Sequence, residues 1–296
     1  MRSVSVVIPL YNHGKYIAET LYSVLEQSYP AREIIVVDDG SKDGCGSIVE
    51  ALAVNNKNII FWRQPNRGAH NAINAGVARA TSDIVLILNS DDIYHRDRLA
   101  EIERAFREQD ADAVFTDVDY CDGDSKKIEF EWHQNAMAEY KAHKVFDESL
   151  INGNFIATTS NIAFKRDDLE AIGAFSNLRY AHDLDFFLRL ALQDRKVVHI
   201  QKPLMTYRLH GSNTISEGHD RVRLEWVAVT GWYLAALARK KGWGELNRFY
   251  PVLEKHSLLR PLLPVVSYFY DSQATTMEGH RFFTDADFRS ALIELL

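Results

Sequence analysis

The chain has 296 residues, of which 46% are hydrophobic and 25% are charged, a composition typical of a globular protein rather than a disordered or fibrous one. Its formal net charge of −7 argues against a surface for long nucleic acids, because such a surface needs a basic stripe. An acidic protein can bind a small phosphorylated ligand only where a few cations, helix N-termini or a metal ion supply local positive charge.

The first hundred residues are predicted to alternate between buried strands and helices. Residues 4–11 are apolar on both faces, as in strands that helices cover on both sides, and residues 13–29 carry apolar side chains at helical spacing. This alternation predicts βαβ units with right-handed crossovers and a mainly parallel sheet, and hence an α/β fold. Further strands are predicted at 33–39, 58–64 and 83–88, and further helices at about 48–52 and at 69–80.

The second half of the chain is predicted to be less regular and to end in helices. Residues 121–153 show no clear pattern, whereas the chain from about residue 220 is helical and rich in Leu, Trp and Tyr. The other predicted elements are helices at 98–108 and 182–193, strands at 111–120 and 196–200, a strand and short helix within 159–175, and breaks of the C-terminal helices at Pro251, Pro261 and Pro264.

Polar residues end three of the predicted strands. They are Tyr11 with Asn12, Asp38 with Asp39, and the run Asn-Ser-Asp-Asp at 89–92. Ligands of parallel α/β sheets bind beyond the carboxyl ends of the strands. We therefore expect these three polar clusters to meet in one crevice.

The first cluster does not carry a Gly-x-Gly-x-x-Gly turn, which is the usual sign of a dinucleotide-binding site. Its absence argues against the interpretation of this chain as a dinucleotide-binding dehydrogenase. Pro9, Tyr11 and Asn12 stand there instead. The Tyr11 ring could stack on a nucleobase, or it could simply cap the sheet.

The other two clusters are acidic. Asp38 and Asp39 precede Gly40 and Ser41, so a turn followed by a helix cap would explain the presence of one of these two acids. It explains both less readily. The other carboxylate could accept a hydrogen bond from a uracil or thymine imide or from a ribose hydroxyl. Two neighbouring carboxylates after a buried strand repel each other unless a cation lies beside them. Residues 89–92 therefore form either a solvated turn or a site where Mg²⁺ or Mn²⁺ bridges to a diphosphate.

Four stretches of the chain resemble the family 2 glycosyltransferases of the GT-A fold. VSVVIPLYNHGKYIAETLYSVLEQSYPAREIIVVDDGSKDG (4–44) is similar to the opening of that family, and NRGAHNAINAGVARATSDIVLILNSDD (66–92) is similar to its middle block, which leads into an Asp-x-Asp metal-binding motif. HDLDFFLRL (182–190) and YRLHGSNTIS (207–216) extend the likeness, which covers about residues 3–216. The resemblance implies a Rossmann-like, mainly parallel sheet flanked by helices, with a helical C-terminal appendage.

The resemblance also implies an activity. This is inverting transfer of a hexosyl or N-acetylhexosaminyl group from a nucleotide diphosphate donor to a hydroxyl of a glycan or lipid-linked acceptor, in synthesis of cell-surface polysaccharide. UDP-sugars are the first expectation for the donor, because Tyr11 and Asp39 suit a uracil base. dTDP-sugars are the second and GDP-sugars the third. The rivals are a nucleotidyltransferase, for which PLYNHGKY is a poor version of the Gly-rich loop, and a non-catalytic sugar-nucleotide-binding module, which Asn89 favours.

For the donor site, the resemblance implies that Tyr11 and Asp39 contact the base and that Pro9 shapes the same pocket. Asp91 matches the second acid of the Asp-x-Asp motif and would be the metal ligand. Asn89 replaces the first acid, so it brings an amide that can bind a hydroxyl but adds no charge to the metal site. The residues that would line the nucleotide and sugar are Asn66, Arg67, Gly68, Asn74, Asn89 and Ser90.

For catalysis, the resemblance places the base at Asp183, which would take the proton from the acceptor hydroxyl as its oxygen attacks opposite the leaving diphosphate. Alternatively, Asp183 is only an acid favoured by a helix N-terminus, and Asp185 competes for the role from a different helical face. His210 would bind the metal or touch the diphosphate, and Arg208 would offset its charge. A plain surface histidine is the alternative for His210.

We place a boundary near residue 218, between a catalytic domain (1–218) and a helical region (219–296) that contacts the acceptor, a membrane surface or a subunit. Residues 220–260 hold eight Lys or Arg against four Asp or Glu, with Trp and Tyr interleaved. Such a region could lie on an anionic membrane beside a lipid-linked acceptor, although packing on the catalytic domain or in a homo-oligomer is favoured. The apolar stretch at 288–296 indicates a continuing chain or a dimer contact.

Cys45 and Cys121 match no metal-binding or redox spacing, so we expect a reducing compartment. The first strand is not preceded by a signal segment, and the uncharged stretch at 226–238 is shorter than the ~20 residues of a membrane span. We therefore expect a cytoplasmic protein, either in solution or peripheral at the inner face of the membrane.

Overall fold

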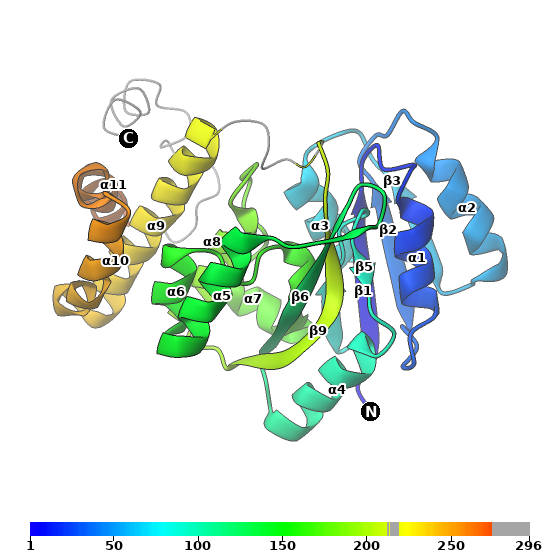
Figure 1. The fold of residues 1–296 in the computed structure, drawn as a ribbon, viewed down its shortest axis with the longest axis horizontal. Coiled ribbons are helices and arrows are strands. Elements are labelled where there is room, and N and C mark those ends of the chain that lie inside the picture. Colours follow the sequence, from blue (N-terminus) through cyan, green and yellow to red (C-terminus); the bar gives the residue numbers. More distant parts are fainter. Residues whose placement is uncertain (212, 214–218, 274–296) are drawn as a thin grey trace. The chain divides into compact units, whose positions relative to one another are not determined.

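The computed structural model describes residues 1–211, 213 and 219–273, which form two compact units (Figure 1). We call residues 1–130, 156–174 and 195–211 the sheet unit, because they contain the β-sheet. We call residues 131–155, 175–194 and the described residues after 211 the helical unit.

The sheet unit is built on one mixed sheet. Its strands are β1 (Val4–Leu10), β2 (Glu33–Asp38), β3 (Ile59–Arg63), β4 (Ile84–Ile87), β5 (Ile93–Tyr94), β6 (Ala113–Asp122), β7 (Lys127–Ile128), β8 (Ala163–Lys165) and β9 (Val197–Leu209). Their order is β3-β2-β1-β4-β8-β6-β9-β5, with β7 paired to β6. The predicted parallel pairing holds from β3 to β4, and β9 is parallel to β6, whereas β5, β7 and β8 pair antiparallel to their neighbours.

Helices cover both faces of β1, which explains why that strand is apolar throughout. The helices of this unit are α1 (Ile17–Leu25), α2 (Cys45–Asn55), α3 (Ala69–Val77), α4 (Arg98–Gln109) and α7 (Leu169–Ile172). Val6 and Ile8 belong to a core shared with α1, α2 and α4. Val7 contacts α3 instead, at Gly76, where a Cβ would lie 2.3 Å from Val7 Cγ1. Glycine at this position therefore lets α3 pack closely on β1 and β2.

Strand β9 is longer than the predicted strand at 196–200. It continues past Pro203 to Leu209, and its pairing with β6 shifts register on both sides of Asp117, which lies opposite Pro203. A bulge at this place accommodates a proline, which cannot donate a backbone hydrogen bond to the ladder. The extension brings Arg208 and His210 to the end of a strand, beside the turn that follows β4.

Among its described residues the helical unit contains helices and the loops that join them, and no strand. The helices are α5 (Glu131–His143), α6 (Phe146–Asn152), α8 (His182–Leu192), α9 (His219–Lys241), the 3-10 helix η4 (Trp243–Phe249), α10 (Tyr250–Lys255) and α11 (Leu259–Ser272). Two predictions are corrected here. Glu131–His143 and Phe146–Asn152 are helices within the stretch predicted to be irregular, and Pro264 lies inside α11, whereas Pro251 stands in the first turn of α10, where proline is favoured.

The predicted domain boundary near residue 218 and the apolar stretch at 288–296 lie outside the described residues. The compact units differ from a single cut at that point, because α5, α6 and α8 group with the C-terminal helices. Contacts of α8 with α6 and α9 account for this grouping. Over the ranges 1–211, 213 and 219–273, each helix is too short or too polar to cross a membrane.

A partly buried ion pair joins three elements of the helical unit. Arg248 Nη1 of η4 donates to Asp147 Oδ1 of α6 at 2.9 Å, and the Tyr233 hydroxyl of α9 donates to the same carboxylate. Burial alone would raise the pKa of Asp147, but hydrogen bonds from Arg248 and Tyr233 lower it below its usual value. The ionised pair therefore stabilises the unit at neutral pH.

We expect Arg248→Met to destabilise the protein by about 2 kcal/mol, less than for a fully buried pair, because the Arg248 side chain is 32% exposed. Since the pKa of Asp147 is lowered in the folded state, the native pair loses its contribution as the pH falls through that pKa, and the variant should be less sensitive to acid. Urea unfolding at pH 7 and below about pH 3 measures both effects, because the contribution is lost only between the ~3.9 of an unfolded aspartate and the lower pKa of the folded state. Exposed Arg260→Met is the control, and an equal loss in both variants would contradict the prediction.

Candidate active site

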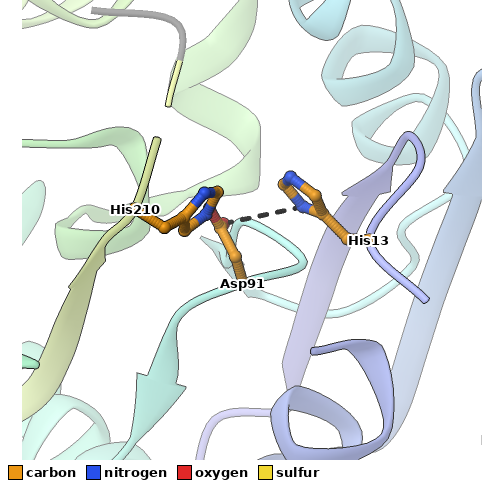
Figure 2. Close-up of side chains that lie close together, drawn as sticks. All are labelled: His13, Asp91 and His210. Carbon is orange, nitrogen blue, oxygen red and sulfur yellow. Dashed lines mark hydrogen bonds and ion pairs between the residues drawn. The ribbon is translucent and has the colours of Figure 1, made fainter. Parts of the chain in front are cut away.

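Three potential metal ligands converge beyond the carboxyl ends of β1, β4 and β9. His210 Nε2 lies 2.9 Å from Asp91 Oδ2, and His13 Nδ1 lies 3.9 Å from Asp91 Oδ1 (Figure 2). One ligand atom from each residue lies within 4.8 Å of the other two. The structure thus brings together the predicted pair Asp91 and His210, and it adds His13, which the sequence analysis missed. Its position directly after Tyr11 and Asn12, at a strand end already expected to bind a ligand, was the available signal.

The Asp91 turn is held from two sides. Arg208 Nε of β9 donates to the Asp91 carbonyl at 2.8 Å, and Thr20 Oγ1 of α1 donates to the carbonyls of Ser90 and Asp92. The side chains of Asp91 and His210 are only 8% and 6% exposed. The carboxylate is therefore fixed in a desolvated place, where its interaction with a cation is strong.

Arg208 itself is buried among protein groups. Its Nη2 donates to Glu19 Oε2 at 2.7 Å, its Nη1 donates to Ser125 Oγ at 2.8 Å, and its guanidinium lies over the Tyr16 ring. The same Tyr16 ring stacks on His210, with ring centroids 4.9 Å apart. Arg208 therefore positions two members of the cluster, and its contact with a donor stays a prediction.

The two neighbours of this turn, Asn89 and Asp92, point elsewhere. Asn89 Nδ2 donates to Thr158 Oγ1 at 3.0 Å, and Asn89 Oδ1 accepts from Thr159 Oγ1 at 3.2 Å. Asp92 accepts from Ser160 Oγ and, at 3.0 Å, from the Arg208 backbone N–H. Burial and the neighbouring charge of Asp91 raise the pKa of Asp92 well above its usual value. Both residues thus anchor the turn to residues 158–160 or to β9.

The paired acids at the end of β2 have separate structural roles. Asp38 accepts from the Ser41 backbone N–H at 2.9 Å and from Arg63 Nε at 2.8 Å, so it supplies the turn contact that the sequence assigned to one of the two acids. Asp39 accepts from the backbone N–H groups of Arg67 and Gly68. Asp39 therefore fixes the loop of three predicted donor-binding residues, 66–68.

The remaining predicted donor-binding residues lie around the same sheet edge. Pro9 is buried in β1, and Tyr11 is 45% exposed just beyond it, so the Tyr11 ring is not covered as a simple cap of the core would be. Asn66 and Arg67 are exposed, and Asn74 is partly buried on α3. Ser90 Oγ lies 2.8 Å from His13 Nδ1, so Ser90 contacts a member of the cluster. Base and sugar contacts remain predictions for all of them.

Asp183 lies in the first turn of α8, in the helical unit. Its Oδ2 accepts from Asn154 Nδ2 at 2.9 Å, its Oδ1 accepts from the Leu184 backbone N–H at 2.7 Å, and burial raises its pKa to about 6. A carboxylate with that pKa is ionised near neutral pH and still basic enough to take a proton. The sequence analysis missed Asn154, which carries no motif.

The structure distinguishes Asp183 from its rival. Asp185 is completely buried, and its Oδ2 accepts from Arg189 Nη2 at 2.7 Å and from Ser176 Oγ at 2.8 Å. Asp185 and Arg189 therefore form an internal ion pair of α8.

Glu225 of α9 accepts from three successive backbone N–H groups, those of Arg179, Tyr180 and Ala181, and so fixes the turn from which α8 begins.

Comparison with known proteins assigns this arrangement to a family. Residues 5–173 match the model described as Glycosyl transferase family 2. TuaG of Bacillus subtilis (strain 168), whose name assigns it to teichuronic acid biosynthesis, is 29% identical over 226 residues, which cover 75% of this chain and 85% of TuaG.

Two solved structures share the fold. TarS 1–349 of S. aureus in complex with UDP aligns with a TM-score of 0.61 and 18% identity, over 99% of this chain and 88% of the TarS chain. The mannosyltransferase PcManGT of Pyrobaculum calidifontis, in complex with GDP-Man and Mn²⁺, aligns with a TM-score of 0.61 and 20% identity, over 100% of this chain and 86% of that chain. These likenesses confirm the predicted GT-A fold. Because the family model covers more than half of the chain, the chain belongs to glycosyltransferase family 2 and is a glycosyltransferase.

Proposed function

We propose that this enzyme transfers a sugar from a UDP-sugar to a hydroxyl of a glycan or glycolipid acceptor, with inversion, during synthesis of cell-surface polysaccharide. The convergence of Asp91 and His210 at the strand ends carries the proposal, because it provides a place for a cation beside the expected diphosphate. Exposed Tyr11 and the fixed loop at 66–68 would receive the nucleoside. The TuaG likeness supports the cell-surface setting, and the TarS complex supports UDP ahead of dTDP and GDP.

A divalent cation, Mn²⁺ or Mg²⁺, fits the residues present. Asp91 offers a buried carboxylate and His210 an imidazole next to it, and both are ordinary ligands of divalent metals. When bound, the metal would neutralise charge on the leaving diphosphate. The PcManGT complex with GDP-Man and Mn²⁺ supports a metal in this fold, and GDP remains the alternative donor base.

Asp183 would act as the base in this reaction. Asn154 and the Leu184 N–H bind its ionised oxygens, which orients the carboxylate and leaves lone pairs for the acceptor hydroxyl. Asp183 would take the hydroxyl proton while the oxygen forms its bond to the anomeric carbon and the bond to the diphosphate breaks. Because the attack and departure occur on opposite faces of the sugar, the configuration inverts without a nucleophile on the protein.

The helical unit would support this base and contact the acceptor. Several basic residues that could contact an anionic membrane instead contact groups of the helical unit. Lys240 and Lys241 pair with Asp194, and Arg239 donates to the Phe269 carbonyl. These contacts favour packing over adhesion to an anionic surface. Exposed Trp243, Tyr250 and Leu263 are the side chains through which a membrane or a second subunit would be contacted. Buried Cys45 and Cys121, which form no disulfide, support a reducing, cytoplasmic compartment.

Calorimetry with UDP, dTDP, GDP and CMP tests the donor, in Mn²⁺ and in chelator. We expect UDP to bind most tightly, and only with Mn²⁺, since Asp91 and His210 would hold the cation and the cation would offset the charge of the diphosphate. Release of UDP from a panel of UDP-sugars, with glycan and glycolipid acceptors, then tests turnover. Equal binding of all four nucleotides in chelator would contradict the donor assignment, and tight UDP binding without turnover would favour the sugar-nucleotide-binding module.

A further inference from the structure

The loop after β1 is built to hold His13 in place. Asn12, directly before it, adopts a left-handed conformation with φ 52°, which asparagine tolerates better than most residues. The Asn12 backbone N–H donates to Ser41 Oγ, and Asn12 Oδ1 accepts from the Lys42 backbone N–H. On the other side, the Gly14 backbone N–H donates to Asp43 Oδ2 at 2.7 Å. His13 is therefore anchored on both flanks.

The His13 ring is also oriented by its surroundings. Its Nδ1 lies 2.8 Å from Ser90 Oγ, and its plane meets that of His210 nearly at right angles, with ring centroids 5.7 Å apart. A hydroxyl within hydrogen-bond distance of Nδ1, the nitrogen that lies 3.9 Å from Asp91 Oδ1, holds this edge of the ring toward the Asp91 turn. The two rings approach Asp91 from different strands (Figure 2).

Asn89, by contrast, is poorly placed to act as a ligand. Its amide oxygen accepts from Thr159 and its amide nitrogen donates to Thr158, so both ends of the side chain are engaged away from the cluster. An amide oxygen there would also add no negative charge. The position where the family keeps the first acid of its motif thus supplies an anchor for the turn.

We propose that His13 is the third protein ligand of the cation, in place of the acid missing at Asn89, and that the resulting set of two imidazoles and one carboxylate selects first-row transition metal ions over Mg²⁺. This rests on the proposed metal-assisted transfer and specifies the site further. Mg²⁺ prefers oxygen ligands and near-ideal octahedral geometry, whereas imidazole suits transition metal ions, with affinity rising from Mn²⁺ through Co²⁺ to Ni²⁺. Three protein ligands leave coordination positions for diphosphate oxygens.

Metal binding to the nucleotide-free protein tests the proposal. The electron paramagnetic resonance signal of free Mn²⁺ reports its affinity, and nitrogen couplings to bound Mn²⁺ report coordinated imidazoles. We expect couplings from two histidines in the native protein and from one in His13→Gln, with Mn²⁺ affinity at least about tenfold lower in the variant. Competition should show Mg²⁺ binding more weakly than Mn²⁺ or Co²⁺. His143→Gln, in the exposed last turn of α5, is the control and should match the native protein.

A second variant separates the ligand role from damage to the loop. Asn89→Asp can still accept from Thr159 Oγ1, although it loses the bond that Asn89 Nδ2 donates to Thr158, and it returns a negative charge to the turn, so combined with His13→Gln it should raise Mg²⁺ affinity relative to Mn²⁺. Native Mn²⁺ affinity with unchanged nitrogen couplings in His13→Gln would overturn the proposal. If the native protein binds no Mn²⁺ but transfers sugar in chelator, this inference and the metal-assisted part of the proposed function fail, while sugar transfer itself stands. Mn²⁺ binding as described, without any transfer, would contradict only the proposed reaction.

Discussion

We expect Asp183→Asn to lower kcat for sugar transfer by about 10²- to 10⁴-fold, the usual contribution of a positioned base. The amide cannot take the proton of the acceptor hydroxyl, although it can still accept a hydrogen bond from Asn154. Because Asp183 is not one of the three clustered ligands, His13, Asp91 and His210, binding of UDP and Mn²⁺ should be unchanged. Steady-state transfer and calorimetry on the same preparation measure the two effects.

The pH dependence provides a second readout for the same residue. With a pKa of about 6, Asp183 is protonated at low pH, so kcat of the native enzyme should fall about tenfold per pH unit below 6 and level off above it. Asn154→Ala removes a hydrogen bond that favours the ionised form, so it should move this limb to higher pH. A merely structural role of Asn154 would lower stability without moving the limb.

Stability separates loss of chemistry from loss of folding. Burial raises the pKa of Asp183 to about 6, above the ~3.9 of an unfolded aspartate, so its ionisation costs folding free energy as the pH rises through 4 to 6. Asp183→Asn removes this cost and should melt at the same or a higher temperature at pH 7. Exposed Asp167→Asn is the control for activity. If Asp183→Asn keeps the native kcat, Asp183 is not the base and another residue takes the proton.

The sequence predicts the N-terminal half of the fold well, because strands buried on both faces leave an unambiguous apolar pattern. Strands β1 to β4 carry this pattern, and each was predicted at its place. Helices α5 and α6 were missed because residues 131–152 mix charged, polar and apolar side chains without clear helical spacing. The end of β9 was missed because Pro203 is a strand breaker unless a bulge receives it, and the bulge depends on pairing with β6.

Only candidate site residues that belong to a recognisable motif could be predicted from the sequence. Asp91 and His210 stand in motifs and are predicted from the sequence, whereas His13 and Asn154 become significant only through partners distant in sequence, Asp91 and Asp183 respectively. Adjacent acids could not be separated from sequence alone. Asp38 and Asp39 face different partners, and so do Asp91 and Asp92, because side chains of successive residues point in different directions. Tertiary contacts thus decide which groups each acid binds, and they place Asp91 rather than Asp92 beside the two histidines.

The second large effect concerns Asp91. We expect Asp91→Asn to abolish Mn²⁺-dependent UDP binding and to lower kcat/KM by at least about 100-fold, because Asp91 supplies the single carboxylate of the three clustered ligands. The variant should still fold. Arg208 binds the backbone carbonyl of residue 91 rather than its side chain, and the amide can keep a hydrogen bond with His210.

Asp92→Asn is the matched control, since it makes the same chemical change one residue along the chain. The Asp92 carboxylate accepts from Ser160 and the Arg208 backbone and is not part of the cluster, so its replacement should leave Mn²⁺ affinity near the native value. Calorimetry with Mn²⁺ alone, then with UDP, separates loss of the metal from loss of the nucleotide. If both variants bind Mn²⁺ and UDP like the native protein, the acids after β4 only end a strand. If Asp91→Asn alone loses Mn²⁺ and with it UDP, the carboxylate holds the cation through which the donor binds.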